Sequence, residues 1–158
     1  MKLTVEEAHH LSERTLIAAG YTQKEADKIT QHIMDTELRG LDYGGLARTL
    51  SVFERTTKHD YTRGPIKVVH ETPLSALVDG QNTIGYLVAR HASDLCIEKA
   101  SEHGMAVVGA RDTWHTGMLS FFAEMAAEHD LVTMIASNAA PHTAPYGGTE
   151  GRFGTTPI

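Results

Sequence analysis

Apolar residues recur at three- and four-residue spacing through the first third of the chain, a period that predicts amphipathic helices. Thr-x-x-Glu capping boxes precede two of these apolar series, and a glycine follows each of them. We therefore predict one helix from the capping box at residues 4–7 to Gly20 and a second from the box at residues 22–25 to Gly40. A third apolar series predicts a short helix that runs towards Lys58.

The period changes at residues 62–65, where the sequence reads Thr-Arg-Gly-Pro. We expect a boundary there, between a helical segment of residues 1–62 and an α/β segment of residues 63–158. Strand and helix periods alternate in the second segment, with a turn at residues 79–82 and a polar loop at residues 111–117. The predicted strands are 66–69, 75–79, 105–110 and 131–137, and the predicted helices are 83–103 and 118–129.

This alternation predicts an α/β layer in which functional loops lie at the ends of strands. The pattern also allows antiparallel strand pairs. Residues 138–158 are rich in Gly and Pro and have little periodicity, which is typical of a functional loop. Because Pro157 and Ile158 resemble the start of a further strand, we expect the chain to be part of a longer protein.

Charge and composition exclude several classes of partner. The chain has 14 Lys and Arg against 20 Asp and Glu, a formal net charge of -6. No basic cluster suits nucleic acid or an anionic membrane, and no apolar run approaches the roughly 20 residues of a membrane span. The single cysteine, Cys96, cannot form an internal disulfide, and the N-terminus leads into a polar helix rather than a signal peptide. We expect a cytoplasmic protein.

Familiar catalytic and phosphate-binding motifs are absent from the sequence. It contains no G-x-x-x-x-G-K-[ST], no G-x-G-x-x-G between a strand and a helix, no H-E-x-x-H and no G-x-S-x-G. A Rossmann fold, a zinc peptidase and a serine hydrolase are therefore disfavoured, and we expect no metal site. The histidines on predicted helices or helix ends lack ligand spacing and are interpreted as solvated or packing residues: His9, His10, His32, His59, His91, His103 and His129.

The loop at residues 111–117 is the main candidate for chemistry. It leaves a predicted buried strand and enters a helix, at the edge where α/β proteins bind ligands. His115 is the candidate acid or base, because an imidazole titrates near neutral pH. Asp112 lies three residues earlier, so a lyase or hydrolase that uses both residues, with or without a metal, is an alternative. That alternative is weaker, since catalytic zinc takes three protein ligands.

Two arginines flank a glycine-rich bend. Arg39 and Arg48 lie on either side of Leu-Asp-Tyr-Gly-Gly at residues 41–45. The planar guanidinium can bind a small carboxylate with two parallel hydrogen bonds. A weak salt bridge on a helix surface is the simpler interpretation of each arginine.

The chain as a whole resembles the malate/L-lactate dehydrogenase type 2 family, which includes ureidoglycolate, sulfolactate and diketogulonate enzymes and piperideine-carboxylate reductases. Four stretches, in the family's order, carry the likeness: residues 39–48, the Val-Asp-Gly turn at 78–80 with its following helix, Asp-Thr-Trp-His-Thr-Gly at 112–117, and residues 138–157. Members of this family are roughly twice as long, so the resemblance implies an N-terminal half.

The resemblance implies an enzyme that uses NAD or NADP and interconverts a small 2-hydroxy carboxylate, or a cyclic amino carboxylate, with its 2-oxo or 2-imino form. It implies a non-Rossmann α/β fold with a mixed sheet and a homodimer whose active site lies near the subunit boundary.

It also implies roles for individual residues. Arg48 would hold the substrate carboxylate, Thr155 would touch the substrate, and His115 matches a histidine that some members use for proton transfer. The residues implied to lie against the nicotinamide cofactor are Thr113, Trp114, Thr116, Asn138 and Ala139.

One departure from the family pattern concerns the proton donor. Many members have Ser-His where this chain has Tyr43 and Gly44. Three replacements remain open: Tyr43, if nearby cations lower its pKa; His115; or a substrate that carries its own proton, such as a protonated imine.

A folded fragment without catalytic activity, or an assembly partner, is the alternative function. A smaller departure is Thr156, where the family commonly has Asn.

Overall fold

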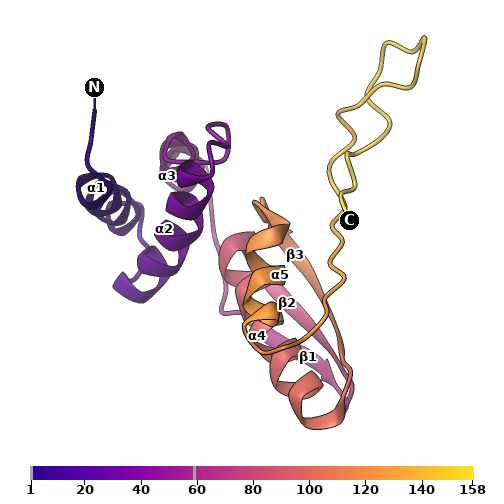
Figure 1. The fold of residues 1–158 in the computed structure, drawn as a ribbon. Coiled ribbons are helices and arrows are strands. Elements are labelled where there is room, and N and C mark those ends of the chain that lie inside the picture. Colours follow the sequence, from indigo (N-terminus) through magenta and orange to yellow (C-terminus); the bar gives the residue numbers. More distant parts are fainter. Residues whose placement is uncertain (1, 59) are drawn as a thin grey trace.

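The chain folds into a helical layer, a mixed sheet covered by two helices, and a long irregular tail (Figure 1). The computed structural model describes residues 2–58 and 60–158, so His59 lies outside the described residues. The helical layer consists of α1 (Val5–Ala18), α2 (Gln23–Leu38) and α3 (Ala47–Lys58). None of the helices in the described part of the chain has the length and apolar content to span a membrane.

Both predicted capping boxes are confirmed. The Thr4 hydroxyl accepts a hydrogen bond from the Glu7 amide, and the Glu7 carboxylate accepts one from the Thr4 amide. Thr22 and Glu25 repeat this reciprocal arrangement at the start of α2. Two otherwise unpaired amides are thereby satisfied at each helix start, which explains why these helices begin where the sequence indicates.

The sheet has the mixed topology that the sequence allowed. Its strands are β1 (Lys67–Glu71), β2 (Ser75–Ile84) and β3 (Val107–Trp114), in the spatial order β1-β2-β3. β1 pairs with β2 antiparallel, and β2 pairs with β3 parallel through the crossover helix α4 (Gly85–His103). α4 packs on β2 and β3, and α5 (Leu119–Ala127) packs on α4. The predicted fold class, a helical segment followed by a non-Rossmann α/β layer, is confirmed.

Two predicted boundaries in the sheet are wrong. β2 does not end at the turn at residues 79–82 but continues through it to Ile84, with a register shift against β3 between Asp79 and Thr83. Gln81 and Asn82 take positive φ values of 48° and 59°, and the Asp79 carboxylate accepts hydrogen bonds from Gln81. The predicted turn residues, 79–82, therefore form a bulge inside the strand. β3 likewise runs on to Trp114, so the first part of the predicted loop is strand.

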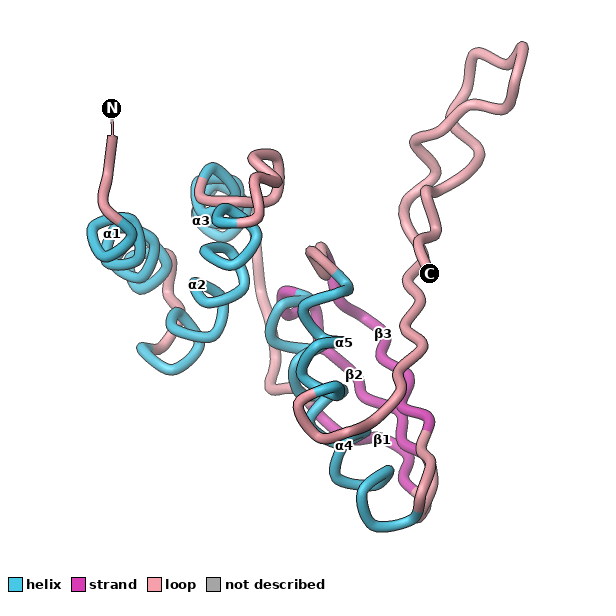
Figure 2. Tube along the Cα trace, viewed as in Figure 1, coloured by secondary structure: helices cyan, strands magenta, loops and turns pink. Residues whose placement is uncertain are grey.

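The predicted strand at residues 131–137 is also wrong. The segment lies outside the described strands, and Val132 and Met134 are 104% and 83% exposed. A β-like sequence becomes a strand only when a neighbour completes its ladder of backbone hydrogen bonds. The tail instead pairs briefly with itself, through Ser137 with Pro157 and Thr143 with Phe153. Figure 2 shows it as a long loop that follows α5 and doubles back towards the C-terminus.

The main core joins the helical layer to the start of α4. Its buried members come from α1, the α1–α2 loop, α2, α3 and the β2–α4 junction: Leu16, Tyr21, Ala26, Ile29, Ile33, Val52, Ile84, Tyr86 and Leu87. A smaller cluster of Val78, Val88 and Ala92 lies between the sheet and α4. The predicted division at residues 62 and 63 stays a prediction, and buried residues from both sides of it share one core. This core fixes the first turn of α4, where the candidate site begins.

Candidate functional site

The candidate site lies where β3 ends and α5 begins. Trp114 closes β3, and the next residues bend sharply: His115 has φ 50° and Gly117 has φ 83°. For a residue with a Cβ, the left-handed region costs on the order of 1–2 kcal/mol. Backbone strain of this kind persists only where the surrounding structure stabilises it, and it is frequent at functional sites.

Tyr86, in the first turn of α4, holds the His115 ring. The Tyr86 hydroxyl and His115 Nε2 are 3.0 Å apart, and the two rings meet edge to face with centroids 5.4 Å apart. Tyr86 is 2% exposed, whereas His115 remains accessible to solvent. Partial burial, reinforced by the nearby charge of Arg48, lowers the pKa of His115. His115 is therefore neutral at pH 7 in this chain.

His32 of α2 is a residue of the site that sequence reasoning interpreted only as a packing or solvated residue. It is 1% exposed, and its Nε2 accepts a hydrogen bond of 2.9 Å from the Met118 amide. Its ring packs against those of Tyr86 and Phe121, each with a centroid separation of 4.5 Å. Its Nδ1 has no hydrogen-bond partner among the described residues. The one sequence signal was its place beside Ile29 and Ile33 on the buried face of α2.

Gly117 packs against the rings of Tyr86 and His32. A Cβ added at this position would overlap both the Tyr86 ring and His32 Nε2. A Cβ added at Gly85, at the start of α4, would likewise overlap the backbone of His115 and Thr116. The loop that carries His115 is thus held against α2 and α4 by close backbone packing as well as by hydrogen bonds.

Arg48 shares the electrostatic environment of His115. Its Nη2 donates a hydrogen bond of 2.8 Å to the Tyr43 carbonyl, and its charge lowers the pKa of His115. Arg48 Nε is buried and has no partner among the described residues. The bend before Arg48 is held by Glu37, whose carboxylate accepts a hydrogen bond of 2.6 Å from the Leu46 amide. Arg48 therefore keeps donor capacity for an incoming anion.

Arg39 follows the simpler of the two interpretations. Its guanidinium forms ion pairs with Asp35 on α2 and with Glu124 on α5, at 2.9 Å and 2.6 Å. These contacts link two helices at the surface.

A large groove of about 1330 Å³ connects most of the predicted site residues. It runs between α4, β3, α5 and the tail. The predicted residues that line it are Thr113, Trp114, His115, Thr116, Asn138, Ala139 and Thr155. The Thr113 hydroxyl donates to the Thr83 carbonyl and the Trp114 indole to the Asn82 carbonyl, so these polar atoms hold β3 to β2.

Arg48 and Tyr43 are not part of the groove lining. Arg48 approaches His115 from the side of the helical layer. Tyr43 is 77% exposed, and its backbone carbonyl rather than its ring contacts Arg48.

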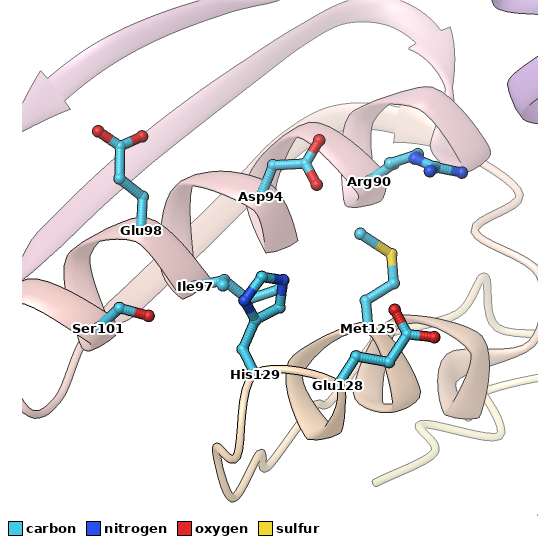
Figure 3. Close-up of a pocket in the computed structure, with 8 residues that line it drawn as sticks. All are labelled: Arg90, Asp94, Ile97, Glu98, Ser101, Met125, Glu128 and His129. Carbon is cyan, nitrogen blue, oxygen red and sulfur yellow. The ribbon is translucent and has the colours of Figure 1, made fainter.

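A second cavity of about 450 Å³ lies between α4 and α5 and contains none of the predicted site residues. Figure 3 shows Arg90 and Asp94 of α4 facing Met125 and Glu128 on the side of α5. In the part of the chain that the structure describes, no group of three or more His, Cys, Asp and Glu side chains could hold a metal ion.

The geometry defines a class: an α/β protein with a non-Rossmann mixed sheet, a histidine on a groove at a strand end, and an arginine close by. Comparison with known proteins narrows this class. A model of the malate/L-lactate dehydrogenase family matches residues 3–158, and the chain belongs to this family.

The relatives are close in fold and moderate in sequence identity. The chain is 29% identical to L-sulfolactate dehydrogenase of Methanothermobacter thermautotrophicus, over 100% of this chain and 47% of the relative. It is 31% identical to ureidoglycolate dehydrogenase (NAD(+)) of Escherichia coli O157:H7, over 100% of this chain and 46% of the relative. The solved malate dehydrogenase of Pyrococcus horikoshii OT3 superposes with a TM-score of 0.88 at 28% identity, over 99% of this chain and 45% of the other. The chain thus spans less than half the length of these relatives.

The packing of Gly117 gives a prediction about stability. Gly117→Ala is expected to lower the free energy of unfolding by about 2 kcal/mol more than Gly104→Ala, as measured by chemical denaturation. Both glycines have positive φ, 83° and 86°, but a Cβ at Gly104 meets nothing within 4 Å. The control therefore separates overlap with Tyr86 and His32 from backbone strain alone. Equal losses in the two variants would contradict the packing described here.

The burial of His32 gives a prediction about pH. Burial, with smaller contributions from the charges of His115 and Arg90, lowers the pKa of His32 to about 3. The unfolded chain, with an ordinary histidine pKa near 6.5, then binds the proton first as the pH falls. Stability from His32 is complete above pH ~6.5 and is lost towards pH 3.

We expect the free energy of unfolding of the wild type to fall between pH 6 and 5 by about 1 kcal/mol more than that of His32→Gln. Glutamine keeps an acceptor for the Met118 amide but does not titrate. Urea denaturation across this pH range measures the difference. Parallel curves would show that His32 is protonated as readily in the folded state as in the unfolded one.

Proposed function

We propose that the protein to which this chain belongs is an oxidoreductase that uses NAD or NADP. It interconverts a small 2-hydroxy carboxylate and its 2-oxo form, or a cyclic amino carboxylate and its 2-imino form. The observation that carries the proposal is the accessible His115 on a large groove with the charge of Arg48 beside it. The names of relatives support the substrate class, because malate, L-sulfolactate and ureidoglycolate are all 2-hydroxy carboxylates.

The groove suits a nicotinamide cofactor in size and lining. Its volume of about 1330 Å³ exceeds that of a typical small-ligand pocket. Its α4 wall presents the small side chains of Ala89, Ala92 and Ser93, which leave room for a flat ring. The residues proposed to hold the cofactor are Thr113, Trp114, Thr116, Asn138 and Ala139. One relative is named for NAD(+), and the choice between NAD and NADP stays open in the proposal.

The chain's own residues bind the substrate and handle its proton. Arg48, whose Nη2 is held by the Tyr43 carbonyl, presents the remaining donors of its guanidinium to the substrate carboxylate. Thr155 lines the same groove as His115 and contacts the substrate from the tail side. When bound, a nicotinamide cofactor supplies or accepts the hydride. His115 binds the oxygen at C2, where negative charge develops during reduction.

Among the candidates to replace the family histidine at the C2 oxygen, His115 is supported best. Gly44 stands where many members of the family have a histidine, so another group has to act. Tyr43 is 77% exposed and is not part of the groove lining. His115 lines the groove and forms a hydrogen bond with the Tyr86 hydroxyl. A catalytic role for Tyr43 stays a prediction.

The assembly and the location of the protein are part of the same proposal. We propose a homodimer, as the family resemblance implies, and a cytoplasmic protein, as the single cysteine and the polar N-terminal helix lead us to expect. The second candidate function is a folded part without activity of its own, or an assembly partner. Its support is that the chain spans 45–47% of the length of the relatives described above.

Cofactor binding is the first test. Trp114 is the only tryptophan and lines the groove, so its emission reports on the site. Titration with NADH and with NADPH is expected to quench this emission with saturation below millimolar concentration for at least one of them. Free N-acetyltryptophanamide, titrated in parallel, corrects for light absorbed by the cofactor. If neither cofactor binds at millimolar concentration, the proposed function is wrong for this chain.

The role of His115 has a kinetic test. His115→Ala is expected to lower turnover of 2-oxo or cyclic 2-imino carboxylates by about 100-fold and to leave cofactor affinity within a few-fold. Loss of absorbance from the reduced cofactor measures turnover, and Trp114 emission measures affinity. His129→Ala is the matched control, because His129 lines the other cavity. Equal turnover in the two variants would remove His115 from the chemistry.

A further inference from the structure

The Tyr86 hydroxyl is a buried polar group whose hydrogen bond within the described residues goes to one partner, His115. Tyr86 is 2% exposed and packs against His32 with ring centroids 4.5 Å apart. The hydroxyl lies 3.0 Å from His115 Nε2. The remaining charged group nearby is Arg48, which acts on both Tyr86 and His115. Arginine has only donors, so it cannot accept the phenolic proton.

This arrangement decides which partner donates. If His115 donated its Nε2 proton to Tyr86, the buried O–H of Tyr86 would be left without an acceptor, at a cost of about 1–3 kcal/mol. If Tyr86 donates to Nε2, both groups are satisfied. Burial raises the pKa of Tyr86, which keeps the phenol protonated and able to donate. With Nε2 as the acceptor, a neutral His115 carries its proton on Nδ1.

We propose that Tyr86 is a positioning residue that holds His115 as the neutral Nδ1–H tautomer, so that the ring presents a donor rather than a lone pair to the groove. This inference rests on the proposed function for its catalytic meaning. In the reduction direction, Nδ1–H donates a hydrogen bond to the C2 oxygen of the substrate and stabilises the negative charge that develops there. A base for the reverse direction would first have to move that proton. The proton that the C2 oxygen takes up in reduction then comes from solvent, because a neutral imidazole that lost its Nδ1 proton would become an imidazolate.

His32 provides a reference inside the same molecule. A backbone amide can only donate, so the hydrogen bond from Met118 fixes His32 Nε2 as an acceptor and places its proton on Nδ1. His32 and His115 are thus expected to be the same tautomer for two independent reasons. A change that affects the Tyr86 hydroxyl alone should alter His115 and leave His32 as it was.

The test is nitrogen-15 NMR of the 158-residue chain labelled in histidine, at neutral pH. Two-bond proton–nitrogen correlation spectra distinguish the two tautomers without any turnover. Assignments come from His115→Asn and His32→Gln. We expect Nδ1–H signatures for both histidines in the wild type. An Nε2–H signature for His115 in the wild type would overturn the inference at once.

Tyr86→Phe then tests the cause. Phenylalanine keeps the ring that packs against His32 and Gly117 but removes the hydroxyl. We expect His115 to shift towards Nε2–H, the tautomer that free histidine prefers, while His32 stays Nδ1–H. Tyr61→Phe is the matched control, because the Tyr61 hydroxyl bonds to the Asn82 carbonyl and should leave His115 unchanged. An unshifted His115 in Tyr86→Phe would overturn the role of Tyr86.

A milder substitution covers the case in which Tyr86→Phe also disturbs His32. Replacement of tyrosine by 3-fluorotyrosine keeps the hydroxyl and makes it a stronger donor. We expect the Nε2 resonance of His115 to move and that of His32 to stay. A stationary His115 resonance would contradict donation from Tyr86.

The catalytic meaning has a separate readout. In an active preparation, Tyr86→Phe is expected to lower kcat of reduction about 10-fold with little change in KM. An unchanged kcat together with a changed tautomer would show that the tautomer does not matter for catalysis. Failure of cofactor binding would count against the proposed function alone, because the NMR result does not depend on it.

Discussion

The hydrogen bond from the Met118 amide to His32 joins residues that are 86 positions apart, and the site is built around it. It ties the end of the His115 loop to the buried face of α2. The same histidine packs against Tyr86, which in turn holds the His115 ring. The helical layer therefore does more than complete the core. Without it, the turn between β3 and α5 would have neither its anchor nor its shape.

The bend before α3 shows how the chain accommodates its departure from the family pattern. A Cβ at Gly44 would lie 2.9 Å from Thr36 Cγ2, so a histidine at this position requires the Thr36 side chain to shift. In this chain the bend packs tightly against α2, and Glu37 fixes the Leu46 amide. Arg48 consequently leaves the bend in a defined direction, towards Tyr86 and His115. The bend therefore carries Arg48 but has Gly44 where many members of the family have a histidine.

The local features of the fold followed from the sequence, and the long-range ones did not. The capping boxes at Thr4 and Thr22 act within four residues, so the pattern predicted them. His115 was predicted because the period changes on either side of its loop. His32 and Tyr86 gave no such signal, since their roles depend on partners 86 and 29 positions away. Residues 131–137 show the opposite error: their local pattern is that of a strand, but no neighbouring strand pairs with them in the described part of the chain.

The left-handed backbone at His115 narrows the ways in which this site can diverge. Such a conformation is tolerated readily by glycine and, among other residues, mainly by Asn, Asp and His. Replacement by a β-branched residue would disturb the loop as well as the chemistry. Asn or Gly would leave the loop intact and remove the imidazole. A relative that kept this scaffold without the role proposed for His115 would therefore be expected to carry one of those residues here, which makes position 115 a marker for that proposed role.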